Sequence, residues 1–417
     1  LVFHFGIVFP VLYWGVMLLL AFICPEITWS FFTFGSAIMY KLWLDRQFGI
    51  PYNFFVPILL ICLLLYTRNN FEVKKIDWHR FFMLILFIAY LTFSCIVSSQ
   101  TSYGLHKVRV FVVNGCVLLI TFYLFSSKVQ ILSMLKVIFL LGFVYYIVVL
   151  MLPSYSAGQR LSAVGINPIW FARGLGMSIV TALFLGFWNR NVIIKLLYGI
   201  SSIAFFYYTL RTGSRGPLVA LLGSIIFAVF VYIIKRNSLT IGSIAKMLLS
   251  FLLILILLFS IMQLSKGDGT SRIMSQTGTS SESGLIRLFL LFEAWQMFKG
   301  SPIVGQGFGA YLSSRAGYFV YPHNIIMELL SETGIVGLAM FVLLIWFAAV
   351  SAWKHLSTLD FKSFGFQITL YFSSMFVYYM LNAQVSGDIS MNLYVFMFMG
   401  ALWATEEWSP DVLKESM

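Results

Sequence analysis

The chain has 417 residues, of which 60% are hydrophobic and only 10% are charged, whereas an average soluble domain carries about 25% charged residues. Apolar stretches long enough to cross a bilayer recur from one end to the other, so the sequence predicts an all-α polytopic membrane protein rather than a soluble domain or a barrel. The net charge of +12 fits cytoplasmic loops that follow the positive-inside rule, and no basic, aromatic-rich soluble segment indicates nucleic acid binding.

Hydropathy predicts about 12 or 13 membrane spans, which follow one another along the chain. The first is expected to be a retained helix rather than a signal peptide, because no small-residue cleavage site flanks it. The four cysteines form no Cys-x-x-Cys pair, so we expect neither a metal site nor a disulfide framework. The expected spans are residues 5–24, 27–44, 52–67, 80–98, 107–126, 132–152, 168–188, 192–210, 216–234, 244–263, 333–353, 364–382 and 389–405.

Lysines and arginines mark alternate loops and therefore predict the orientation. The basic loops are assigned to the cytoplasm. Lys41 and Arg46 conflict with this assignment, because they lie outside if each early segment spans the membrane once. The loops expected to face outward are residues 99–106, 153–167, 211–215, 264–332 and 383–388. The chain then divides into an N-terminal bundle (1–263), a large outward-facing loop (264–332) and C-terminal helices with a short cytoplasmic tail (333–417).

The large loop contains a mobile Gly/Ser/Thr-rich part, 264–283, and an amphipathic helix predicted over 284–299. Arg287 falls on the apolar face of this helix, where it must either reach up to water or meet a buried anion, and we favour the anion. The opposite, polar face is expected to carry Glu293, Gln296 and Lys299.

Six arginines lie in the loops expected to face outward, where the positive-inside rule disfavours them. They indicate an anionic partner, although scattered contacts with lipid phosphates would also explain them. These residues are Arg160, Arg211, Arg215, Arg272, Arg287 and Arg315.

The stretch from Tyr321 to Glu332 places a histidine, an amide and two carboxylates at the entrance of an apolar segment. Such groups are costly there unless they are paired or functional. His323 is the one histidine of the large loop; it is a candidate base, or else a helix-start residue that bonds to backbone or a headgroup. Glu328 either orients His323, binds sugar hydroxyls, or pairs with Asn324 or an arginine.

Glycines alternate at positions 305, 307 and 309 just before this stretch. The run does not follow a strand of a βαβ unit, which argues against a dinucleotide site. We expect a tight turn that lets the backbone approach a neighbouring segment or a ligand.

Three motifs, in the same order, resemble the O-antigen ligase/Wzy polymerase superfamily of bacterial envelope glycan transferases. The motifs are Thr212-Gly213-Ser214-Arg215-Gly216; Arg287 with Trp295, Pro302 and the glycines 305, 307 and 309; and Pro322-His323-Asn324 with Glu328-Leu329, Gly334 and Gly337. Arg160, followed by Asn167-Pro168, adds a weaker fourth match.

The resemblance implies a GT-C-like helical enzyme of the bacterial inner membrane, with its active site facing the periplasm. Such an enzyme transfers a glycan from undecaprenyl diphosphate to a sugar hydroxyl with inversion, using no nucleotide sugar, cofactor or essential metal. The implied catalytic residues are Arg215, Arg287 and His323. The expected substrate contacts are Arg160, Arg211, Tyr321, Asn324, Glu328 and Trp295.

The implied partners are the lipid-linked donor, a glycan acceptor, membrane lipids and a chain-length regulator. The motifs favour a Wzy-type polymerase, which extends a lipid-linked repeat unit, over a ligase that uses lipid A–core. A third hypothesis is a lipid-linked oligosaccharide transporter or flippase. It is disfavoured because the halves show no repeat and the polar residues gather at one membrane face.

Overall fold

A computed structural model describes most of the chain after residue 77. The described residues are 26–27, 29–30, 78–125, 127–156, 160–163, 165–236, 279–316 and 319–408. The expected spans 5–24, 52–67 and 244–263 lie outside them, as do nearly all of 27–44, residues 264–278 and the conflicting Lys41 and Arg46.

The described part of the chain is mostly helical, and seven of its helices are long and apolar enough to cross a membrane. This confirms the prediction of an all-α polytopic membrane protein, while the total of about 12 or 13 spans stays a prediction. The seven are α5 (Trp78–Ile96), α6 (Thr101–Leu124), α7 (Lys128–Met151), α8 (Pro168–Trp188), α9 (Val192–Arg211), α10 (Arg215–Arg236) and α14 (Ile325–Thr358). The remaining elements are β1 (Pro153–Ser156), β2 (Arg160–Ala163), α13 (Thr279–Gly300), the 3₁₀ turn η2 (Ala310–Ser313), α15 (Phe364–Ala383) and α16 (Leu393–Thr405).

The long helices run side by side, and α6 packs on α16, α8 on α9, and α10 on α15. Aromatic rings fill the space between them; Phe111 meets Phe87 and Phe396 edge-on, with ring centroids 5.4 and 5.0 Å away. Edge-to-face pairs at such distances stabilise a core beyond the area that they bury.

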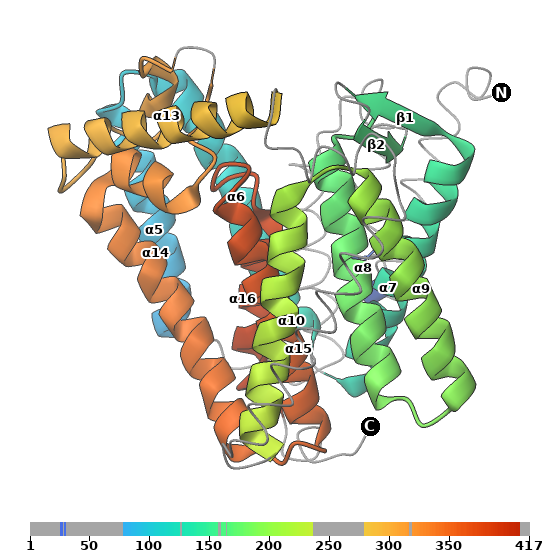
Figure 1. Cartoon of the computed structure of the whole chain (residues 1–417). Helices are drawn as coiled ribbons and strands as arrows, with labels where there is room; N and C mark the ends of the chain where they lie inside the picture. The colour runs from blue at the N-terminus through green and yellow to red at the C-terminus, as the bar shows by residue number, and fades with distance from the viewer. Residues whose placement is uncertain are drawn as a thin grey trace, which may run out of the picture.

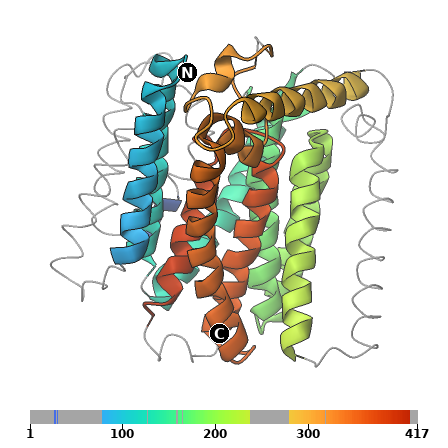
Figure 2. The ribbon, with the colours of Figure 1, turned by 90° about the vertical axis from the view of Figure 1, so that its left-hand side faces the viewer.

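Two elements cover the same end of the bundle. Figure 1 shows α13 lying across this end, with the β1–β2 hairpin beside it, and Figure 2 shows the same crosswise course of α13. The hairpin occupies a loop expected over 153–167, and its antiparallel register pairs Tyr155 with Leu161. The hairpin therefore places Arg160 at a fixed position at this end of the molecule.

α14 begins eight residues before the span predicted at 333, and it is broken at Gly334 (φ 66°, ψ −164°). The predicted start therefore corresponds to the break, because the apolar run begins only there. The turn after α13 replaces the helical bonds lost at the break with four backbone hydrogen bonds. Ile335 and Val336 donate to Pro302 and Ile303, while Gln306 and Gly307 donate to Ser331 and Glu332.

The alternating glycines make this contact possible. Gly305, Gly307 and Gly309 all have positive φ, and a Cβ on Gly305 would lie 2.3 Å from the carbonyl carbon of Glu332. The turn also touches α6, since a Cβ on Gly104 would lie 2.3 Å from the Phe308 oxygen. The prediction of a tight turn that approaches a neighbouring segment is confirmed.

Candidate functional site

An open pocket at the α13 end is lined by three arginines from three elements. Arg160 comes from β2, Arg215 is the first residue of α10, and Arg287 comes from α13. The space within the pocket is about 650 Å³, part of it open to solvent. Val385 and Ser386, which follow α15, also line the pocket, as does the turn before α10.

Arg160 shapes the turn that presents Arg215. Its Nε donates to the Thr212 carbonyl (3.1 Å) and its Nη2 to the Ser214 hydroxyl (2.8 Å). Gly213 in this turn has a φ of 61°, and a Cβ on Gly216 would lie 2.7 Å from the Val385 side chain. Arg215 opens α10, where the helix dipole adds to its attraction for an anion.

α13 carries Arg287 over the pocket. Its inward face buries Leu290 and Ala294 against Tyr311, whose hydroxyl donates to the Leu290 carbonyl (2.9 Å). Glu293, which the sequence places on the polar face of this helix, is buried and only 5% exposed. The reason is that α13 lies across the bundle end, so this flank is covered while large apolar residues such as Leu288 stay exposed.

His323 lies close enough to Arg287 to feel its charge, although it does not line the arginine pocket itself. Burial, followed by the positive charge of Arg287, lowers the pKa of His323 from 6.5 to about 4. Its backbone is left-handed (φ 59°), and the Tyr321 ring packs edge-on at 4.6 Å between centroids. Its buried Nδ1 has no hydrogen-bond partner among the described residues. The imidazole is therefore neutral at pH 7, as a base requires.

The other residues expected to contact substrate lie on several different elements. Asn324 caps α14, accepting from the Met327 amide (2.9 Å) and donating to the Gln384 carbonyl (3.2 Å). Arg211 ends α9 and donates to the Tyr207 hydroxyl, while Trp295 lies 45% exposed on α13. Neither Arg211 nor Trp295 lines the arginine pocket.

Residues 200–342 match a family model described as O-antigen ligase. This match over about a third of the chain supports the resemblance to the O-antigen ligase/Wzy superfamily. The matched range contains Arg215, Arg287 and His323, whereas Arg160 and the 385–386 wall lie outside it. No curated protein matches the sequence.

Glu328 is fully buried, and its partner differs from those that the sequence suggested. It pairs with Lys107 of α6 at 2.5 Å, rather than with Asn324 or an arginine, because it lies one turn inside α14 and faces α6. Glu332 contacts the same ammonium at 2.6 Å. The sequence interpretation missed this network, and the signal for it was a lysine and two glutamates in otherwise apolar segments.

Arg173 of α8 was also missed, because it lies in an apolar span. It is 5% exposed, and it donates to the carbonyls of Asn382 and Ser386 at 2.9 and 3.0 Å. These bonds hold the segment that forms one wall of the arginine pocket. Within the described residues, no group of three or more His, Cys, Asp or Glu side chains is placed to hold a metal ion.

Proposed function

We propose that this protein is an inverting, metal-independent glycosyltransferase that takes a glycan from undecaprenyl diphosphate and joins it to a sugar hydroxyl. The observation that carries the proposal is the convergence of Arg160, Arg215 and Arg287 on one pocket, with a neutral histidine beside Arg287. Arginine binds phosphate through two parallel hydrogen bonds and remains charged at every relevant pH.

We infer the following reaction from this geometry. The acceptor hydroxyl oxygen attacks the anomeric carbon, and the bond from that carbon to the diphosphate oxygen breaks with its electron pair staying on the diphosphate. The three arginines stabilise the negative charge that develops on this leaving group. His323 takes the hydroxyl proton through Nε2, because its Nδ1 is buried.

The proposed location is the bacterial inner membrane, with the α13 end facing the periplasm. The pocket, α13 and the hairpin share one end of the bundle, as an enzyme acting at one membrane face requires. Tyr321 and Trp295 are proposed to stack on sugar rings, and Asn324 to help position His323. The structure gives Glu328 no access to substrate, so its proposed role is support.

We favour polymerisation of O-antigen, capsule or exopolysaccharide repeat units, on the basis of the Pro302–Gly309 turn and the Pro322–Leu330 motif. A chain-length regulator would then be a partner. The alternative acceptor is lipid A–core, which would make the protein a ligase. A lipid-linked oligosaccharide transporter fits less well, because the pocket arginines lie at one end and not midway along the spans.

A reconstitution tests the proposal. Purified protein in liposomes receives the undecaprenyl-diphosphate-linked repeat unit of its host, with and without lipid A–core. A ladder of longer lipid-linked glycans without core supports a polymerase. Product that forms only with core identifies a ligase. If a verified, intact donor gives no product in either case, the transferase proposal fails.

A further inference from the structure

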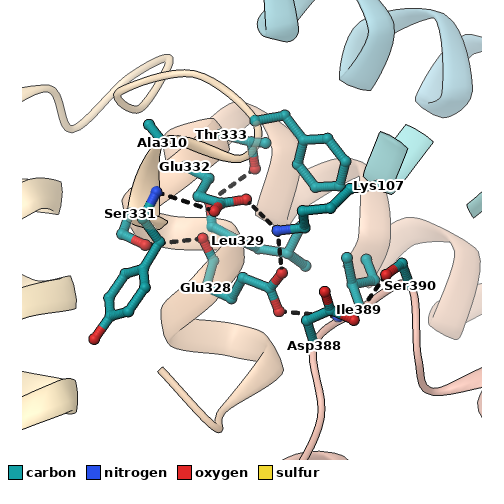
Figure 3. A network of polar contacts seen from close by, with 12 residues as sticks. Lys107, Ala310, Glu328, Leu329, Ser331, Glu332, Thr333, Asp388, Ile389 and Ser390 are labelled. Carbon is teal, nitrogen blue, oxygen red and sulfur yellow. Dashed lines mark hydrogen bonds and ion pairs between the residues drawn. The ribbon is translucent and has the colours of Figure 1, made fainter. Parts of the chain in front are cut away.

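A buried ion network joins three segments next to the arginine pocket. Lys107 of α6 lies between Glu328 and Glu332 of α14, and all three side chains are at most 1% exposed (Figure 3). The ammonium also lies 4.4 Å from the centre of the Phe308 ring. No part of this network is open to a substrate, so its role must be exerted through other residues.

The second oxygen of each glutamate holds a backbone amide outside α14. Glu328 Oε2 accepts from the Ile389 amide (2.9 Å), and Glu332 Oε1 accepts from the Tyr311 amide (3.2 Å). One lysine thus orients two carboxylates, and each carboxylate fixes one loop. Without the ammonium, two carboxylates would lie side by side in an apolar interior with no cation beside them, which is strongly destabilising for buried charges.

Both loops lead to the proposed site. Ile389 belongs to the loop 384–392, which also contains the pocket residues Val385 and Ser386 and the carbonyl that Asn324 contacts. The same loop donates from the Met391 amide to Asp388. Tyr311 supports α13 from below through its bond to Leu290, one turn after Arg287. The network therefore connects the pocket wall and the Arg287 helix to the start of α14, where His323 lies.

We propose that Lys107 is a positioning residue: by neutralising Glu328 and Glu332, it fixes the loop 384–392 and the Tyr311 support of α13 relative to His323. This role rests on the proposed transferase function. A misplacement of about 1 Å at a reacting centre costs roughly 100-fold in rate. Lys107 therefore controls turnover without touching the substrate.

The test compares Lys107→Met with the triple variant Lys107→Met/Glu328→Gln/Glu332→Gln. Lys107→Met leaves two buried carboxylates without their cation. The triple variant removes every charge of the trio, yet its glutamine oxygens can still accept from Ile389 and Tyr311. Arg80→Met is the control, since it breaks an ion pair between α5 and Glu406 that lies away from the pocket.

We expect Lys107→Met to lower kcat roughly 100-fold per folded molecule. The donor KM should change much less, because Arg160 and Arg215 belong to elements that the network does not hold. The triple variant should recover most of the turnover, and Arg80→Met should lower thermal stability while keeping the wild-type kcat. Hydrogen exchange should speed up at the Tyr311 and Ile389 amides in Lys107→Met and return to wild-type rates in the triple variant.

Wild-type kcat in Lys107→Met would overturn the proposal. A triple variant that protects both amides but stays as inactive as Lys107→Met would also overturn it. If Lys107→Met does not fold, the triple variant alone tests the proposal, because the proposal requires the triple variant to fold and to transfer glycan. If the wild-type protein transfers no glycan, the proposed function fails by itself, and the exchange rates still decide whether Lys107 fixes the two loops.

Discussion

At the scale of single residues, His323 combines two features that work against stability. Its backbone occupies the left-handed region, which costs a non-glycine residue roughly 1 kcal/mol or more. Its ring is partly buried with an unpartnered nitrogen, among the described residues, and beside a cation. A residue held in this way near the arginine pocket fits a chemical role better than a packing role.

Two substitutions separate the chemistry of His323 from its backbone. His323→Asn keeps a side chain that tolerates the left-handed region, and His323→Gly removes the strain. Both should lower transfer by about 10²- to 10⁴-fold, because neither supplies a base. Only His323→Gly should raise the thermal unfolding temperature. Transfer close to wild type in either variant would contradict the role of His323 as base.

The pH profile gives an independent check on the same residue. The pKa of His323 is about 4, so the imidazole stays neutral and kcat/KM should hold from pH 7 down to about 5. Below that, protonation removes the base and the rate falls. An acid limb near pH 6.5 would show an ordinary, solvated histidine.

Removing the Arg287 charge should move the acid limb of the pH–rate profile to higher pH. In Arg287→Gln the pKa of His323 rises, because the neighbouring cation no longer opposes protonation, but burial is the larger cause and keeps the pKa below 6.5. The residual rate of this variant should therefore fall at a higher pH than the wild-type rate. The free energy of unfolding of the wild-type protein should also fall as pH decreases from 6.5 towards 4. In this range only the unfolded chain takes up the proton on His323.

At the scale of elements, the decisive feature is the break in α14. Its four replacement hydrogen bonds tie the turn after α13 to the helix that begins beside His323. The glycine spacing in the sequence predicted the tight turn, and hydropathy predicted a span from 333. Neither pattern predicted that the two contact each other, because backbone bonds between distant segments leave no local signal.

Gly334→Ala tests this contact. Gly334 has a φ of 66°, and a Cβ would lie 2.3 Å from the Ile303 carbonyl oxygen, so the change should destabilise the fold by about 1–3 kcal/mol or more. Gly199→Ala in α9 is the matched control, because nothing lies within 4 Å of its added Cβ; it should be neutral or slightly stabilising. Equal unfolding temperatures for the two variants would show that the contact does not matter for stability.

At the scale of the whole molecule, the predictions that agree best with the structure are the span boundaries, which rest on hydropathy. The span predicted at 168–188 coincides with α8, and α5, α7, α9 and α10 begin and end within a few residues of their predicted bounds. The motifs also selected Arg160, Arg215 and Arg287, which share one pocket. Lys107 and Arg173 stand out in the sequence only as charges in apolar segments. Their partners could not be predicted, because pairing across helices depends on tertiary packing.

The proposed orientation makes a prediction at this scale. In a background without cysteines, Gly284→Cys and Ser313→Cys lie at the α13 end, while Arg190→Cys and Asp360→Cys lie in loops assigned to the cytoplasm. In spheroplasts, a membrane-impermeant maleimide should label the first two variants and leave the last two unlabelled until the membrane is opened. The reverse pattern would place the pocket in the cytoplasm and exclude a periplasmic reaction.

The origin of the pocket from distant parts of the chain has a consequence for biosynthesis. Arg160 and Arg215 are translated early, and Arg160 bonds to Thr212 and Ser214, which precede Arg215 directly. Ser386 follows on the order of ten seconds or more later, at 5–20 residues per second. Arg160 and Arg215 are therefore synthesised well before the Val385–Ser386 wall of the pocket. A polypeptide released before α15 is finished lacks the Val385–Ser386 wall of the pocket. If the proposed function holds, translation cut short should therefore yield inactive protein.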